Sequence, residues 1–70
     1  MENYNYSKLL GEMRAKGITQ EGIAKALNRN VATINLKLNN RGYFTQSEID
    51  AICDILDILP EQVGEYFFAH

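Results

Sequence analysis

A chain of 70 residues with a formal net charge of −2 has room for one small domain with a thin hydrophobic core. Its single cysteine excludes an intrachain disulfide, and one cysteine with one histidine cannot supply the four ligands of a structural zinc site. The 46% hydrophobic content argues against disorder, no apolar run is long enough to span a membrane, and the N-terminus is too polar for a signal peptide. We therefore expect a cytoplasmic protein in a reducing compartment, without metal or cofactor.

Apolar residues at helical spacing predict an all-α fold of five short helices, over about residues 6–16, 20–27, 31–39, 46–57 and 60–67. The clearest N-terminal signal is Thr45 with Glu48, which together match a capping box. Thr19 and Asn30 are suitable N-caps for the second and third helices. The remaining boundary signals are Asn5 or Ser7 before the first helix, Gly17 after it, Gly42 after the third and Pro60 at the start of the last.

The second and third helices are joined by only three residues, and Asn28 at the bend tolerates a left-handed conformation. So short a connection makes the two helices cross steeply, as in a helix-turn-helix. Ala24 is small enough for close approach, and the apolar contacts between the helices are expected from Ile23, Leu27 and Ile34. The pattern predicts a single, compact five-helix domain over residues 1–70 that contains a helix-turn-helix.

Charge is divided unevenly along the chain. All seven Lys and Arg residues lie in residues 1–43, whereas residues 44–70 hold six acidic residues and neither Lys nor Arg. Such a division favours one surface that meets an anionic partner and another that faces away from it. A solvated bipolar surface that only keeps the chain soluble is the alternative.

Several short stretches match a known pattern: YSKL (6–9), ITQE (18–21), AK (24–25), TI (33–34), LKLNN (36–40), FTQSEI (44–49), PE (60–61) and YFF (66–68). Over nearly its whole length the chain resembles the small Cro/repressor-type helix-turn-helix regulators of Gram-positive phages and prophages. The resemblance implies a repressor-like fold, transcriptional regulation in a bacterial host cell, and homodimeric binding to two-fold operator DNA. The chain departs from the family pattern at several positions, and among them Arg29 and Lys37 stand where apolar core residues are common.

In that family the third helix enters the major groove of double-stranded DNA and the second helix abuts the backbone. Carried over, the resemblance predicts DNA-backbone contacts from Gln20, Asn30, Lys37, Asn40, Arg41 and Tyr43. The residues that it places on the base-reading face are Val31, Ala32, Asn35, Leu36 and Asn39. Asparagine can pair with adenine through two hydrogen bonds, and apolar side chains can pack on the thymine methyl group, so this face is able to read bases.

The same apolar face leaves a second function open. A protein-binding modulator, such as an antirepressor that captures a repressor protein, would use Val31, Ala32 and Leu36 against its partner. The low isoelectric point, about 5.2, favours this alternative, whereas Gln20 and the basic N-terminal half favour DNA.

The remaining residues suggest no enzyme. Asp50, Asp54 and Asp57 on the fourth helix have the spacing of a solvated polar face rather than of a catalytic or metal-binding pair, and Cys53 falls on the apolar stripe as a buried thiol. The aromatic residues of the last segment are expected either to cover the core or to mediate self-association, and these are Tyr66, Phe67 and Phe68.

Overall fold

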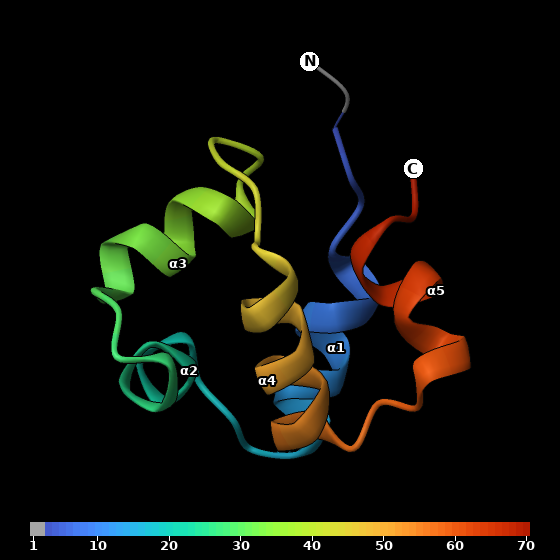
Figure 1. The fold of residues 1–70 in the computed structure, drawn as a ribbon, viewed down its shortest axis with the longest axis horizontal. Coiled ribbons are helices and arrows are strands. Elements are labelled where there is room, and N and C mark those ends of the chain that lie inside the picture. Colours follow the sequence, from blue (N-terminus) through green and yellow to red (C-terminus); the bar gives the residue numbers. More distant parts are fainter. Residues whose placement is uncertain (1–2) are drawn as a thin grey trace.

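A computed structural model describes residues 3–70 of the chain. Its helices are α1 (Ser7–Ala15), α2 (Gln20–Leu27), α3 (Val31–Leu38), α4 (Gln46–Leu56), the 3₁₀ helix η1 (Pro60–Gln62) and α5 (Val63–Phe67). α4 runs through the middle of the molecule, with α2 and α3 on one side and α1 and α5 on the other (Figure 1). The prediction of an all-α fold with five helices is confirmed, and residues 3–70 contain no strand.

Helices α2, α3 and α4 begin where capping side chains satisfy free backbone amides, whereas the N-cap of α1 is Tyr6, without a side-chain cap, and not the predicted Asn5 or Ser7. Thr19 accepts a hydrogen bond from the amide of Gly22, and Asn30 accepts one from the amide of Ala32. Thr45 and Glu48 form the complete capping box that the sequence predicts. The expected last helix is instead divided into η1 and α5, so its first turn is tighter than an α-helical one.

Left-handed residues lie at or just after the C-terminal ends of four helices. Asn28 ends α2 with φ 55°, as predicted, and Gly17 follows α1 with φ 67°. After α3 the expected residue was Gly42, but the left-handed position belongs to Asn40, with φ 62°. Asp57 ends α4 with φ 55°, because a short polar side chain tolerates this conformation better than other side chains do.

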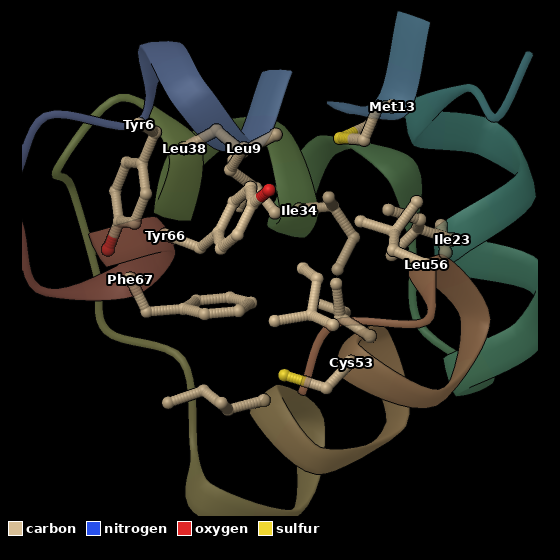
Figure 2. Packing of buried hydrophobic residues seen from close by; sticks show 14 residues of the cluster. Tyr6, Leu9, Met13, Ile23, Ile34, Leu38, Cys53, Leu56, Tyr66 and Phe67 are labelled. Carbon is tan, nitrogen blue, oxygen red and sulfur yellow. The ribbon is translucent and has the colours of Figure 1, made fainter. Parts of the chain in front are cut away.

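One hydrophobic cluster joins all five α-helices. Figure 2 shows the side chain of Phe67 pointing into this cluster from α5, toward residues of α4. The largest side chains that it buries completely are Phe67, Leu9, Ile23, Ile34, Ile52 and Leu56. Cys53 belongs to the same cluster, as its place on the apolar stripe predicts.

The segment before α1 is held in place at two points. The amide of Tyr4 donates to Oδ1 of Asn40 at 2.8 Å, and Nδ2 of Asn40 donates back to the carbonyl of Tyr4 at 3.0 Å. The amide of Asn5 donates to the carbonyl of Ala69 at 2.7 Å. Both ends of the described chain therefore lie beside each other, near the C-terminal end of α3 (Figure 1).

Among residues 3–70, no helix is both long enough and apolar enough to cross a membrane.

Candidate functional site

α2 and α3 form the most closely packed helix pair of the molecule. Figure 1 shows α2 almost end-on while α3 lies across the view, so the two helices cross steeply after the turn at Asn28. Ile23 and Ala24 of α2 and Ile34 of α3 are buried in the common core, and Leu27 packs against it. The side of α3 that carries Ile34 therefore faces the core, and the opposite side faces solvent.

The outward side of α3 is the face that the sequence predicts for DNA or a partner. All five of its predicted residues are exposed: Val31, Ala32, Asn35, Leu36 and Asn39. Val31 and Leu36 have 40% and 49% of their surface accessible, which is unusual for large aliphatic side chains. The face therefore combines apolar surface with two carboxamides and has no charged member.

The carboxamides are connected to α2 by hydrogen bonds. Nδ2 of Asn35 donates to Oε1 of Gln20 at 3.1 Å, and Nδ2 of Asn39 donates to the carbonyl of Asn35 at 2.8 Å. Gln20, the first residue of α2, thus lies on the same surface as the centre of α3. These exposed bonds hold Asn35 in one orientation, and they would have to open or be shared for Asn35 to bind a base edge through both of its amide atoms.

The predicted backbone-contacting residues fall into different environments. Arg41 and Tyr43 are exposed after α3, beside the predicted face. Asn30 is also exposed, although its side-chain oxygen already caps α3. Asn40 is engaged with Tyr4, so its side chain fastens the N-terminal segment instead of reaching into solvent.

Lys37 is the clearest correction to the predicted site. Its ammonium lies 2.7 Å from Oε1 of Glu48, and only 15% of its side chain is exposed. The side chain is directed into the protein rather than toward a ligand, so Lys37 does not belong among the phosphate-contacting residues.

Glu48 is buried, with 3% of its surface exposed, and connects three parts of the fold. Oε1 accepts hydrogen bonds from Lys37 of α3 and from the amide of Thr45, and Oε2 accepts one at 3.3 Å from Nε of Arg29, in the turn between α2 and α3. Burial alone would raise the pKa of Glu48, but the hydrogen bonds from Lys37 and Thr45 outweigh it and hold the pKa below its usual range. Glu48 therefore carries a charge that fixes α3 and the α2–α3 turn against the start of α4.

Sequence reasoning identifies Glu48 only as a capping residue. The signal that could have revealed its second role is the pair of cations, Arg29 and Lys37, at positions that are commonly apolar in the resembled family. Lys37 is poorly exposed and therefore requires a buried anion, and Glu48 is that anion; Arg29, whose side chain is 52% exposed, pairs with the same carboxylate from the solvent side.

Other ion pairs take up further cations. Lys8 pairs with Glu65, and Lys16 lies 3.8 Å from Glu12. Within residues 3–70, the cations that form no ion pair are Arg14, Lys25 and Arg41. The sequence has no acidic residue between Glu21 and Glu48, so the surface around α3 is neutral to basic despite the overall net charge.

The three C-terminal aromatic residues have different roles. Tyr66 and Phe67 are buried core residues, so they are not available for the predicted self-association. Phe68 keeps 46% of its surface exposed and packs edge-on against Tyr4, whose ring also meets Tyr43. An exposed aromatic patch thus lies near the C-terminal end of α3.

The remaining polar groups build no metal centre in the part of the chain that is described. No three His, Cys, Asp or Glu side chains of residues 3–70 lie close enough together to hold an ion. Burial first, and then the nearby carboxylates of Asp50 and Asp54, raise the pKa of the Cys53 thiol. A raised pKa keeps this thiol mostly protonated and therefore slow to react at neutral pH.

Residues 3–70 thus define a small all-α protein in which the outward side of α3 forms a partly apolar surface without a charged member. The chain belongs to the family described as "Protein of unknown function (DUF739)", which matches residues 2–70. No curated protein matches the chain.

Proposed function

We propose that the protein is a helix-turn-helix transcriptional regulator that binds operator DNA through α3. The observation that carries this proposal is the shared surface of α2 and α3, where Gln20 at the start of α2 is hydrogen-bonded to Asn35 at the centre of the outward face of α3. A helix that enters the major groove needs exposed side chains that reach base edges, together with a neighbouring helix N-terminus near the phosphates. Beyond the exposed Glu21, the chain has no acidic residue before Glu48, so this surface carries little negative charge that would repel phosphates.

In this proposal each exposed side chain has one role. Gln20 contacts a phosphate, and Asn35 pairs with an adenine. Val31 and Leu36 pack on thymine methyl groups, and Arg41 binds the backbone beside the groove. Two copies bind the halves of a two-fold site, because one α3 helix covers only one major-groove segment.

The test begins with double-stranded sites that are selected from random DNA by the wild-type protein. Asn35→Ala should lower the affinity for the selected site by about 1–3 kcal/mol while binding to unrelated DNA is unchanged. Arg41→Ala should weaken binding to all sequences and reduce the slope of log affinity against log salt by about 1. Lys8→Ala is the matched control, because it removes the same charge from the α1–α5 side of the molecule, where Lys8 pairs with Glu65. Failure to enrich any sequence, or equal effects of Arg41→Ala and Lys8→Ala, would contradict the proposal.

The second candidate function is a modulator that captures another regulator. It is favoured by the exposed aliphatic surface of Val31 and Leu36, and by the ion pairs that leave α3 with no cation directed outward. Leu36→Glu should abolish capture of a repressor partner and leave the fold intact, because Leu36 is 49% exposed. Binding that depends steeply on salt indicates DNA, whereas an apolar protein interface is nearly insensitive to salt.

A further inference from the structure

A groove lies between α4 and the η1–α5 segment, away from the outward face of α3. Its volume is about 470 Å³, within the usual range for ligand-binding clefts. It is lined by Gln46, Asp50, Cys53 and Asp54 of α4, and by Ile58, Pro60 and Val63. The lining residues come from α4 and the segment after it and include none from α2 or α3, so this groove and the outward face of α3 are separate surfaces.

The floor of the groove is apolar. Cys53 and Ile58 are buried, and Val63 is half-buried and packs against the core. Pro60 is exposed at one edge. Such a floor favours a ligand that brings apolar side chains, because each gains from leaving water.

The rim on the α4 side is acidic. Asp50 and Asp54 are exposed and lie one helical turn apart, where like charges repel each other. One oxygen of Asp50 accepts a hydrogen bond from Nε2 of Gln46 at 2.9 Å, and within residues 3–70 neither carboxylate forms an ion pair. A cation placed between the two carboxylates would relieve this repulsion.

The surroundings of the groove reinforce the negative charge. Residues 44–70 contain six acidic residues and neither Lys nor Arg, so no cation of this part of the chain neutralises the rim. A nucleic acid would be repelled here, which leaves a cationic ligand as the complementary one.

We propose that this groove binds a cationic amphipathic segment of a partner protein. A Lys or Arg of that segment lies between Asp50 and Asp54, and its flanking apolar side chains cover Cys53, Ile58 and Val63. The proposal is independent of the function of α3, since it concerns a separate surface with the opposite charge.

The probe is a fluorescent synthetic helical peptide of alternating Leu- and Lys-rich turns, titrated with the full chain at low salt. Two control peptides carry Gln in place of Lys, or Ser in place of Leu, and both should bind at least about tenfold more weakly because each lacks one half of the match. Asp54→Asn should weaken binding of the Leu–Lys peptide about fivefold. Asp57→Asn is the matched control, because it removes the same charge at the residue directly after α4, which does not line the groove, and asparagine tolerates its φ of 55°. The control should change the affinity by less than about twofold.

Cys53 reports where the peptide binds, because it is the only cysteine and lies in the floor of the groove. Saturating Leu–Lys peptide should slow alkylation of Cys53 by iodoacetamide, whereas the Ser-substituted peptide should not. The proposal is overturned if the Leu–Lys peptide does not bind, if Asp57→Asn weakens binding as much as Asp54→Asn, or if bound peptide leaves the alkylation rate unchanged. Sedimentation tests whether a second copy of the chain occupies the groove instead. The proposal is also overturned if the wild type self-associates and Asp54→Asn does not.

Discussion

Removing the carboxylate of Glu48 should destabilise the protein more than removing any exposed charge. Glu48→Ala takes away the acceptor for the Thr45 amide and leaves the poorly exposed ammonium of Lys37 without a partner. Breaking one side of a buried ion pair costs about 3–5 kcal/mol. A domain of this size has about 4–10 kcal/mol of total stability, so the variant should lose a large part of its free energy of unfolding.

Glu48→Gln separates the charge from the hydrogen bonds. Its side-chain oxygen can still accept from Thr45 and Lys37, while the new amide group faces Arg29, whose side chain is 52% exposed and free to move into solvent. We expect a loss of about 1–3 kcal/mol. Adding Lys37→Met to Glu48→Gln should cost less than the sum of the two single changes, because the pair is removed together.

The assay is urea unfolding followed by circular dichroism, with Lys8→Ala as the control for loss of an exposed ion pair, which is worth at most about 1 kcal/mol. The pH dependence gives a second measurement. The folded-state pKa of Glu48 lies below its ordinary value of 4.5, so its contribution is fully present above that value and is lost as the pH falls toward the folded-state pKa. The difference in stability between wild type and Glu48→Gln should therefore be constant from pH 6 to 8 and shrink below about pH 4. A Glu48→Ala variant that unfolds at the same urea concentration as Lys8→Ala would refute the assigned role.

Three further predictions concern the backbone and the thiol. Gly11→Ala should raise the stability by up to about 1 kcal/mol, since Gly11 lies inside α1 and no neighbouring atom lies within 4 Å of the added Cβ. Gly17→Ala should lower the stability by about 1–2 kcal/mol, because φ is 67° at this position. Thermal melts of the two variants should therefore shift in opposite directions. Asn28→Ala should cost about 1 kcal/mol and Asn28→Gly almost nothing, and equal losses in urea unfolding would show that the side chain rather than the left-handed conformation matters. The rate of Cys53 alkylation should be low at pH 8 and should still be increasing with pH above 9.0, the ordinary thiol pKa, because the pKa of Cys53 is raised. A rate that becomes constant at the same pH as in the urea-unfolded chain would show that the pKa of the thiol is not raised.

The sequence predicts those features that depend on neighbours along the chain. The caps at Thr19 and Asn30, the capping box at Thr45 and the left-handed Asn28 all follow from local hydrogen bonding and local sterics. The outward face of α3 is also predictable, because helical periodicity fixes which side Ile34 and Leu38 bury.

Features that depend on contacts distant in sequence are not predictable in this way. The partner of Lys37 lies 11 positions away, and that of Asn40 lies 36 positions away. Composition alone does not choose between a surface lysine and a buried one, nor between an asparagine that binds a ligand and one that binds its own backbone. The burial of Tyr66 and Phe67 depends likewise on how α5 docks, which no local pattern specifies.

The pairing of the two ends of the described chain has a consequence for how the protein is made. Lys8 contacts Glu65 across 57 positions, the hydroxyl of Tyr66 donates to Glu12 across 54, and Asn5 is bonded to Ala69. α1 is translated before its docking partner α5, which is not available until residues 63–69 have been made. The contacts between α1 and α5 therefore form only after the last helix has been translated, so the native structure is completed by a late step that joins segments more than 50 positions apart.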